Sequence, residues 1–412
     1  MKNHLSIFKG LFITLSLASV TLKAQGFQVN LQGQKQQGMA SAGSAFVQDE
    51  SLLFYNPGSA AFVMKNGLNV GVSPTIPNTV YLDSATQIMS RTESPVSTPF
   101  AAYALFSPKD TSRFRIGLAV YTPFGSTVQW PSEWIGRFAI TRLQLKTIFF
   151  QPTLSYQVTN RIGIGAGFVN AIGSVNLQKD IPVINSNGVY GRAELDGRAN
   201  GYGFNIGIYI KPTKQLNLAL SYRSQVNMKV KDGRANFYVP EGLAPNFPNG
   251  KFTSSLPLPQ VFTFGTHYQL NEKINLVADI NYVGWKAYDT LAFDYETNTT
   301  SLLDTKSPRL YENTFAFRLG GQYTVNEKFQ FRAGAAYGIS PVQQGYVTPE
   351  TPDANRFIFT AGVSYLIATN LQVDASMYFT QFTRAAINYE SNLRGTFKTA
   401  VLAPGISIRY QF

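Results

Sequence analysis

Side chains able to carry covalent or metal chemistry are scarce in this sequence. It contains no cysteine and two histidines, His4 and His267. Without cysteine there is no disulfide, thiol catalyst or thiolate-bound zinc, and two histidines so far apart in the chain do not suggest a histidine cluster. A nucleophile assisted by His267 is the remaining enzymatic possibility, but residues 263–268 (TFGTHY) hold no serine or carboxylate pattern of a dyad. The sequence therefore predicts no enzyme, no cofactor and no metal site.

A second kind of chemistry, the burial of hydrophobic molecules, has better candidates. Residues 231–257 form a long segment that carries several aromatic and aliphatic side chains. Such groups bind an alkyl chain without directional contacts, at about 0.8 kcal/mol per buried methylene. The alternative is that they pack the segment onto a rim or belong to an interfacial aromatic belt. The candidate contacts are Phe237, Tyr238, Val239, Leu243, Phe247 and Phe252.

Arginines offer a contact for the head of a solute that carries a carboxylate. Arg223, Arg332 and Arg409 lie at the polar positions of alternating segments. A guanidinium there could hold a carboxylate through a charge-assisted fork, and we take Arg223 and Arg332 as candidate ligand contacts. Pairing with Asp279 or Asp374, or solvation by water, is the alternative for each arginine.

The composition limits the class of protein that positions these residues. Of the 412 residues, 14% are charged, 14% are aromatic and 44% are hydrophobic, and the formal net charge is +12. Soluble domains carry about 25% charged residues, and disordered chains hold few aromatics. Beyond the N-terminus no apolar run reaches the roughly 18 residues of a membrane helix. A disordered chain and a helical membrane protein are therefore excluded, and a lipid surface is a better partner for this basic chain than nucleic acid.

The first 24 residues resemble an export signal. Lys2 and Lys9 precede an apolar run of eleven residues, 10–20, and a cut after Ala24 is expected. Eleven residues are too few to cross the roughly 30 Å core of a bilayer, so the alternative of a membrane anchor is disfavoured. We expect residues 1–24 to be a signal peptide.

Most of the remaining chain alternates with a period of two residues. In residues 274–283 the apolar side chains of Ile274, Leu276 and Ile280 are separated by other residues, and residues 371–379 repeat the pattern. Successive side chains of a strand point to opposite faces, so each segment has one apolar and one polar or small face. About fourteen such strands are expected within residues 67–412. They begin near Gly67, Pro99, Arg113, Leu145, Arg161, Asn200, Gln215, Pro259, Lys273, Leu310, Lys328, Arg356, Leu371 and Phe397.

The turns between these strands are of two kinds. Short polar turns such as 271–273 and 326–328 alternate with longer connections. Short turns at one end and long loops at the other are typical of an outer-membrane barrel. The predicted long loops are Asn176–Asn200, Lys231–Pro257, Tyr288–Pro308 and Ser340–Asn355.

A soluble sheet with one apolar face would also alternate, and it would explain a single hairpin. It explains a long series of extended strands less well. A sheet enters a bilayer only when it is closed, because unpaired backbone groups find no water there. The last strand also ends on an aromatic residue, Phe412, as the assembly signal of outer-membrane proteins does. The predicted fold is thus an all-β transmembrane antiparallel barrel.

Residues 25–66 do not belong to the predicted wall. They lack a sustained period of two and are rich in glycine, alanine, serine and glutamine. Such a segment could be an external tail, or it could pack inside a barrel. Asn56-Pro57-Gly58 would end any short helix formed by residues 49–55, and its flexibility would suit either a movable plug or an ordinary loop.

This segment resembles the N-terminal hatch of the FadL/TodX outer-membrane transporters of fatty acids and hydrocarbons. That hatch has a G-x-x-x-A-G stretch, an aspartate and an Asn-Pro-Ala, and here Gly58 replaces the alanine. A second similar patch runs from Trp134 through residues 162–167 (IGIGAG). The resemblance implies a hatch inside the barrel. The residues to which it assigns hatch or gating roles are Gly38, Gly43, Asp49, Phe54, Tyr55, Asn56, Pro57 and Gly58.

The resemblance also implies a function. It predicts passive uptake of hydrophobic small molecules, with long-chain fatty acids favoured over aromatic hydrocarbons, by capture outside, movement of the hatch and release sideways into the membrane or into the periplasm. Outer-membrane lipid, lipopolysaccharide and the barrel-assembly machinery are the expected partners. The sequence leaves a general or substrate-selective porin and a surface adhesin open. Pro152, inside a predicted strand, marks a bulge or a local break in pairing.

Overall fold

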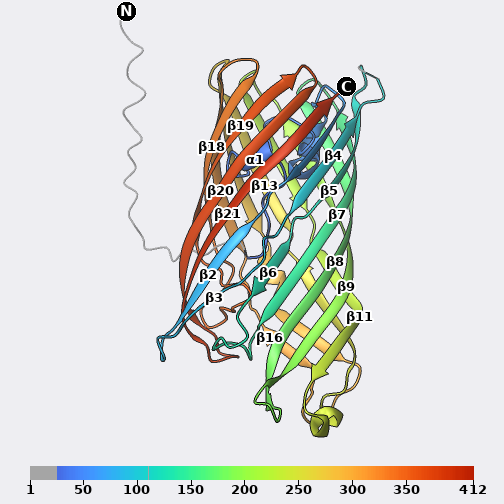
Figure 1. Ribbon diagram of the computed structural model, residues 1–412. Coiled ribbons are helices and arrows are strands. Elements are labelled where there is room, and N and C mark those ends of the chain that lie inside the picture. Colours follow the sequence, from blue (N-terminus) through green and yellow to red (C-terminus); the bar gives the residue numbers. More distant parts are fainter. Residues whose placement is uncertain (1–25, 110) are drawn as a thin grey trace, which may run out of the picture.

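The structure is a computed structural model that describes residues 26–109 and 111–412, so the predicted signal peptide lies outside the described residues. The chain forms one antiparallel sheet that curves into a tall, tilted cylinder (Figure 1). The strands are β1 (Gly67–Val72), β2 (Ile76–Asp83), β3 (Met89–Arg91), β4 (Phe100–Phe106), β5 (Phe114–Tyr121), β6 (Gly125–Gln129), β7 (Arg142–Gln157), β8 (Ile162–Ile184), β9 (Tyr190–Ile210), β10 (Leu216–Arg223), β11 (Val226–Tyr238), β12 (Gly250–Leu258), β13 (Val261–Gln269), β14 (Ile274–Val283), β15 (Thr290–Tyr295), β16 (Thr305–Pro308), β17 (Thr314–Thr324), β18 (Phe329–Gly338), β19 (Arg356–Ala368), β20 (Leu371–Ile387) and β21 (Arg394–Gln411).

These elements combine into a closed ring of 14 wall strands, which confirms the predicted fold class. Several wall strands consist of two elements interrupted by a few residues, as β1 and β2 are. Closure is made by β1, which pairs with β4 on one side and with β21 on the other. Leu68 lies opposite Tyr410, and the final residue, Phe412, donates its backbone N–H to the carbonyl of Asn66. The sheet therefore has no free edge at this seam.

The two ends of the barrel differ as predicted, but the strands are longer than expected. Both barrel termini and the short turns share one end, which we call the turn end, and the longer connections form the loop end (Figure 1). Three of the four predicted loops are present but shorter than predicted. The segments 176–184 and 190–200 extend β8 and β9, and β11, β12, β15 and β16 likewise run into the other two. Polar cross-strand contacts, such as Asn176 with Glu194 at 2.8 Å, stabilise these extensions.

The segment between β18 and β19, residues 339–355, is a long loop as predicted. Pro152 in β7 causes no bulge. The β7–β8 register is unchanged from Phe150 opposite Asn170 to Thr153 opposite Gly167, although the pairs between them are missing. A proline donates no hydrogen bond, so the local break in pairing is confirmed and the bulge is not.

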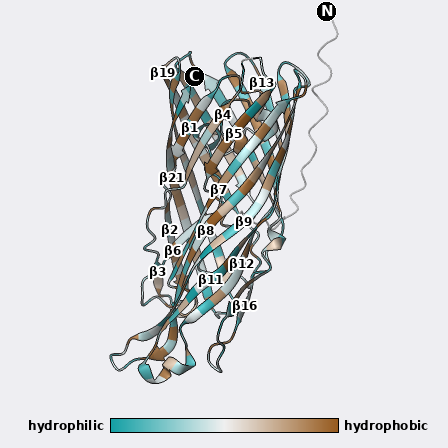
Figure 2. Ribbon diagram, turned by 90° about the vertical axis from the view of Figure 1, so that its right-hand side faces the viewer, coloured by the Kyte–Doolittle hydropathy of each residue, from teal (hydrophilic) through white to brown (hydrophobic). Residues whose placement is uncertain are grey.

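The two faces of the wall have opposite character. Outward side chains such as Leu319 and Phe359 are exposed, and brown hydrophobic stretches recur along the strands in Figure 2, with a more hydrophilic loop end. Inward side chains include Arg318, Arg332 and Arg409, all of which are buried. Within the described residues, the helices are too short or too polar to cross a bilayer.

Residues 26–66 fill part of the lumen, mainly towards the turn end. They contain three single-turn helices, α1 (Gln34–Gln37), α2 (Leu52–Tyr55) and α3 (Pro57–Ala60). Helix α1 lies against β19–β21 and α3 against β7–β10, which are opposite arcs of the ring. We call residues 26–66 the hatch. The later 3₁₀ turns, η1 (Glu241–Asn246) and η2 (Trp285–Ala287), belong to the loop end.

Candidate functional site

The Asn56-Pro57-Gly58 motif is an anchor between the hatch and the wall. Asn56 separates α2 from α3, as predicted, and its Oδ1 accepts from the N–H of Gly58 at 2.8 Å, which caps α3. Its Nδ2 donates to the carbonyl of Ile208 in β9 at 3.0 Å. Pro57 occupies the first helical position, where its missing N–H costs nothing. All three residues are buried, so in this structure the motif is fixed rather than exposed as a loose hinge.

Glycines in the wall make room for this anchor. A Cβ added to Gly58 would lie 2.7 Å from the carbonyl oxygen of Gly207, which explains why this chain has glycine where the resembling family has alanine. A Cβ on Gly165 would strike the backbone of Pro57, and one on Gly163 would meet the carbonyl of Gly58. The IGIGAG patch is therefore the wall surface on which α3 rests.

The Gly38–Ser44 stretch is anchored on the opposite side of the lumen. The N–H of Ala40 donates to the hydroxyl of Thr360 at 2.8 Å, and its carbonyl accepts from Arg318 at 2.7 Å. The N–H groups of Gly43 and Ser44 both donate to one oxygen of Asp279, at 3.2 and 3.1 Å. Gly43 has a φ of 121°, a conformation that favours glycine. Gly38 lies against the backbone of Gly362.

A buried ion pair joins the hatch to the last wall strand. Glu50 receives three hydrogen bonds from Arg409, two at 2.9 Å and one at 3.1 Å, and its side chain has no exposed area. The neighbouring Asp49 accepts from the N–H and the hydroxyl of Ser51 and so stays within the hatch. Arg409, which the sequence placed on the polar face, is thus paired with a carboxylate of the hatch rather than with Asp279 or Asp374.

Of the two arginines considered as ligand contacts, Arg223 contacts the hatch, and Arg332 hydrogen-bonds to other wall residues. Arg223 stacks over the ring of Phe54 at 3.8 Å and donates to the carbonyl of that residue at 2.6 Å. Phe54 packs edge-on against Tyr55, whose ring is buried. Arg332 donates to Gln322 at 2.9 Å and to the hydroxyl of Ser364. Neither arginine lines the apolar cavity described below, and a ligand role for them stays a prediction.

The wall is interrupted between β3–β4 and β5–β6. Strands β4 and β5 are paired from Phe106 to Ala101. Beyond them, the N–H of Thr122 donates to the carbonyl of Phe100, and the N–H of Phe100 donates to the hydroxyl of Thr122. Pairing resumes only where the N–H of Glu93 donates to the carbonyl of Gln129. Prolines at 95, 99 and 123 lie in this interval and cannot donate to a ladder. We call the interval between residues 94–99 and 123–128 the wall opening.

The first described residues of the hatch pair with the inner edge of this opening. The N–H of Val29 donates to Pro123 at 2.8 Å, and that of Gly125 donates to Phe27 at 3.3 Å, so Gln28 lies opposite Phe124. The ring of Phe27 packs edge-on against Trp285 at 4.9 Å between ring centroids. The N-terminal part of the hatch is therefore attached by an isolated β-bridge to the wall beside the opening.

Two cavities meet at Phe27. The apolar cavity, about 80 Å³, lies inside the barrel towards the loop end, and the wall cavity, about 610 Å³, lies at the wall opening. The wall cavity is lined both by inward residues of β7, such as Thr147, and by its outward neighbours Lys146 and Ile148, so it extends across the wall. The residues that line both cavities are Phe27, Ser126, Leu145, Thr147, Glu350 and Thr351.

The loop 339–355 covers these cavities from the loop end and holds the first described residue of the hatch. Asp353 accepts from the N–H of Gly26 at 2.8 Å, from Ser340 at 3.1 Å and from Arg356 at 2.9 Å. Burial raises the pKa of the Asp353 carboxyl above its usual value, and Arg356 opposes that rise. The position of the N-terminal segment is therefore coupled to this loop.

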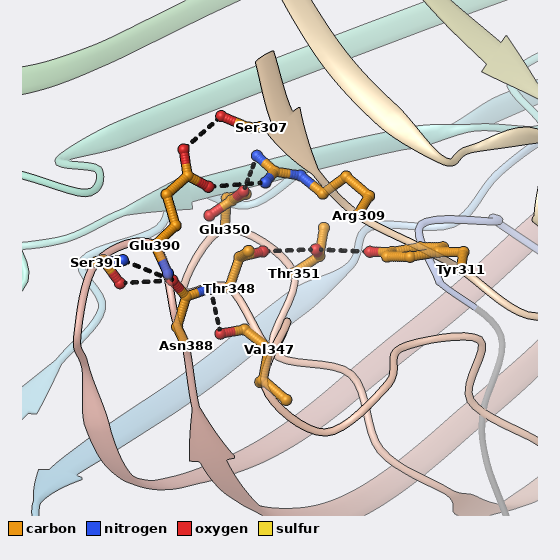
Figure 3. Close-up of polar contacts among 10 residues, drawn as sticks. All are labelled: Ser307, Arg309, Tyr311, Val347, Thr348, Glu350, Thr351, Asn388, Glu390 and Ser391. Carbon is orange, nitrogen blue, oxygen red and sulfur yellow. Dashed lines mark hydrogen bonds and ion pairs between the residues drawn. The ribbon is translucent and has the colours of Figure 1, made fainter. Parts of the chain in front are cut away.

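The same loop is joined to its neighbours by a polar cluster (Figure 3). Arg309 contacts Glu350 at 3.1 Å and Glu390 at 3.5 Å, and Glu390 also accepts from Ser307 at 2.6 Å. Tyr311 and Thr351 join through their hydroxyls at 3.2 Å. Glu350 thus lines both cavities and shares Arg309 with Glu390.

The predicted capture residues lie further out at the loop end. Phe237 and Phe252 are buried, Tyr238 is exposed, and Leu243 and Phe247 belong to or follow η1. Phe237 packs on Phe247 with ring centroids 6.1 Å apart, which is the rim packing that the sequence left as an alternative. Phe237, Tyr238 and Val239 also line an outer cavity of about 680 Å³. Capture by these residues stays a prediction.

His267 is held as a structural side chain. Its ring stacks on Phe46 at 4.2 Å, and its two nitrogens contact Asn217 and Asn275 at 2.7 and 2.9 Å. No serine hydroxyl or carboxylate is among these partners, so the geometry needed to activate a nucleophile is not assembled here.

Sequence reasoning missed Phe27, Glu350 and the wall opening. Pro95, Pro99 and Pro123 were the available signal for the opening, because prolines in two adjacent strands remove ladder donors on both sides. No sequence pattern pointed to Phe27 or Glu350, since each acquires its place through contacts with distant segments.

Comparison with known proteins agrees with this architecture. The family described as outer membrane protein transport protein (OMPP1/FadL/TodX) matches residues 15–412. The chain belongs to this family. It is a bacterial outer membrane β-barrel of a transporter family and not an enzyme. In such barrels the short turns face the periplasm, so the loop end is extracellular.

Individual relatives are distant. A protein of Neisseria meningitidis serogroup B, named as an outer membrane protein, is 26% identical over 89% of this chain and 88% of its own length. The long-chain fatty acid transport protein of Escherichia coli K12 is 20% identical over 92% of both chains. A Pseudomonas aeruginosa FadL homologue has the same fold, with a TM-score of 0.81 at 22% identity over 94% of this chain and 100% of that one. The toluene transporter TodX of P. putida has a TM-score of 0.71 at 16% identity, covering 95% and 99%.

Proposed function

We propose that this FadL/TodX family protein takes up hydrophobic small molecules passively, through the apolar cavity and then sideways through the wall opening. The observation that carries the proposal is the position of Phe27, which lines both cavities and closes the broken part of the wall with its neighbours. Displacement of residues 26–29 would join the two cavities. A solute would then leave at the height of the acyl chains without crossing the hatch.

The interior suits passive entry of an apolar solute, without an energy source. Aliphatic side chains of Leu143, Val175 and Leu256 line the apolar cavity, and burial of apolar surface is the driving force for entry. The protein family accounts for transport of hydrophobic molecules in general, and relatives are named for long-chain fatty acids and for toluene. Lipopolysaccharide, outer-membrane lipid and the barrel-assembly machinery stay predicted partners.

A general porin, the alternative from the sequence, would need an open polar lumen. Anchors on opposite arcs, at Asn56 and at Ala40, hold the hatch across the lumen and argue against it. Conductance in planar bilayers separates the two: a large steady current would favour the porin.

A cysteine pair tests the proposed route, since the chain has no cysteine of its own. Gln28 and Phe124 form a non-hydrogen-bonded antiparallel pair, whose Cα atoms lie about 4.5 Å apart, within disulfide range. Gln28→Cys with Phe124→Cys, oxidised, should stop uptake of radiolabelled toluene and oleate by cells that lack other proteins of the family. Reduction should restore it.

The matched control joins two strands that stay paired. Ala104→Cys with Leu118→Cys bridges β4 and β5 beside the opening. This pair, oxidised, and each single cysteine should leave uptake unchanged. Uptake that continues when residue 28 is locked to residue 124 would contradict the proposed route.

A further inference from the structure

The charges around the apolar cavity bear on which hydrophobic molecules it accepts. Among its described lining residues, the side chain with a full charge is Glu350, and lysine, arginine and histidine are not represented. The remaining lining is mainly aliphatic and aromatic, with a few hydroxyl groups. A ligand carboxylate in this cavity would therefore meet one carboxylate and no cation on the lining.

The cation nearest to Glu350 is already engaged. Arg309 is 92% buried on its side chain and is held between Glu350 and Glu390, so one positive charge faces two negative ones. The cluster carries a formal charge of −1. Arg309 is not itself among the residues that line the cavity, whereas its partner Glu350 is.

The cations that line the adjoining wall cavity do not face the apolar cavity. Its lining includes Arg356, which contacts Asp353 at 2.9 Å, and Lys146. Lys146 is an exposed side chain on the outer face of β7, between the inward residues Leu145 and Thr147. A carboxylate would reach this amine only after it had left the interior.

We propose that the apolar cavity selects neutral hydrophobic molecules, such as hydrocarbons and their uncharged derivatives, and that Glu350 is the residue that disfavours carboxylates. The proposal rests on the proposed function and narrows its substrate class. A buried carboxylate without a partner loses its hydration, and a second carboxylate nearby adds repulsion. An apolar or esterified solute of the same length meets neither penalty. The fatty acid preference expected from the sequence is thereby reversed for this chain.

Brominated probes that quench tryptophan fluorescence test the selection. Trp285 lies 4.9 Å from Phe27, between ring centroids, and Phe27 lines the cavity. The full-length protein in detergent at pH 8 is titrated with 1-bromooctane, methyl 8-bromooctanoate and 8-bromooctanoate, which share an alkyl chain. We expect the two neutral probes to quench at similar concentrations and the carboxylate to need at least about ten times more. Trp285→Phe should remove the quenching and so assign it to this site.

Glu350→Gln should strengthen quenching by 8-bromooctanoate severalfold and leave that by the ester within about twofold, because it removes the repulsion and releases Arg309. Glu390→Gln is the matched control: Glu390 contacts the same arginine but is half exposed and does not line the cavity, so the preference for neutral probes should persist. Ser126→Lys, at a lining position, should allow the carboxylate to bind even if Glu350→Gln fails to fold.

The outcomes separate the two proposals. Equal quenching by the acid and its ester in the wild type overturns the selection and leaves the cavity as the binding site. If neither neutral probe quenches the fluorescence, the cavity is not the binding site, and the proposed selection fails with it. An unchanged response of Glu350→Gln to the carboxylate overturns the role of Glu350.

Discussion

The buried Glu50–Arg409 pair gives the sharpest test of how the hatch is held. Glu50 belongs to the hatch and Arg409 to β21, and the pair is joined by three hydrogen bonds of 2.9 to 3.1 Å. Removing one partner of a buried pair leaves an uncompensated charge and costs about 3–5 kcal/mol. Because Arg409 belongs to the wall, its unpaired charge stays there, and we expect Glu50→Ala to destabilise the docked position of the hatch by this amount. Each 1.4 kcal/mol changes the ratio of undocked to docked hatch about tenfold, so the ratio should rise by roughly 100-fold to 4,000-fold.

The assay is ion conductance of the purified protein in planar bilayers. The wild type should be nearly closed, and Glu50→Ala should show frequent openings, because a displaced hatch exposes a lumen lined by Arg318, Arg332 and Asp279. The control is the double variant Glu50→Leu with Arg409→Met. Apolar groups of similar volume replace a buried pair at little cost, so this variant should conduct close to the wild type.

Two results would refute this reasoning. Conductance of Glu50→Ala equal to that of the wild type would mean that the pair does not restrain the hatch. A double variant as leaky as the single one would mean that packing around Glu50, rather than the unpaired charge, sets the effect.

Three further changes probe other parts of the hatch. Deleting residues 25–66 should leave a barrel that inserts into membranes but conducts ions, and a truncated barrel as closed as the full chain would contradict the plug. Gly58→Ala places a methyl group 2.7 Å from the carbonyl oxygen of Gly207 and should lower stability by about 1–3 kcal/mol, measured by thermal unfolding in detergent. Gly242→Ala, in open space, is its control and should change stability by less than about 0.5 kcal/mol. Asp353→Ala removes the acceptor of the Gly26 N–H and should speed hydrogen exchange at residues 26–29, whereas exchange at Ala40 should stay slow.

Much of the wall could be predicted from the sequence, because strand faces follow a local rule. Alternation over segments such as 274–283 fixes which side chains point outward, and the observed strands agree with it. The loop ends were predicted less well. Asparagine, glycine and charged residues in 176–200 suggested loops, but β8 and β9 continue there, since backbone pairing proceeds wherever a partner strand is alongside.

The hatch could be recognised from its composition and from its resemblance to a known family, but the contacts that its residues make could not. Gly163, Gly165 and Gly207 belong to wall strands that are distant in sequence from Gly58, and only their approach to it explains them. Arg223 and Arg409 lie on the inner face as predicted, yet their partners are Phe54 and Glu50, which no local pattern identifies.

The sequence by itself determined a closed barrel with an apolar exterior, a separate N-terminal segment and the scarcity of catalytic side chains. These properties depend on composition and on a two-residue period, which are local. Tertiary structure alone decided where the wall opens, which residue lies between the cavities and which charged side chain lines the apolar cavity. Those properties depend on pairs such as Gln28 with Phe124 and Arg309 with Glu350, whose members meet only when the ring closes and the hatch docks inside it.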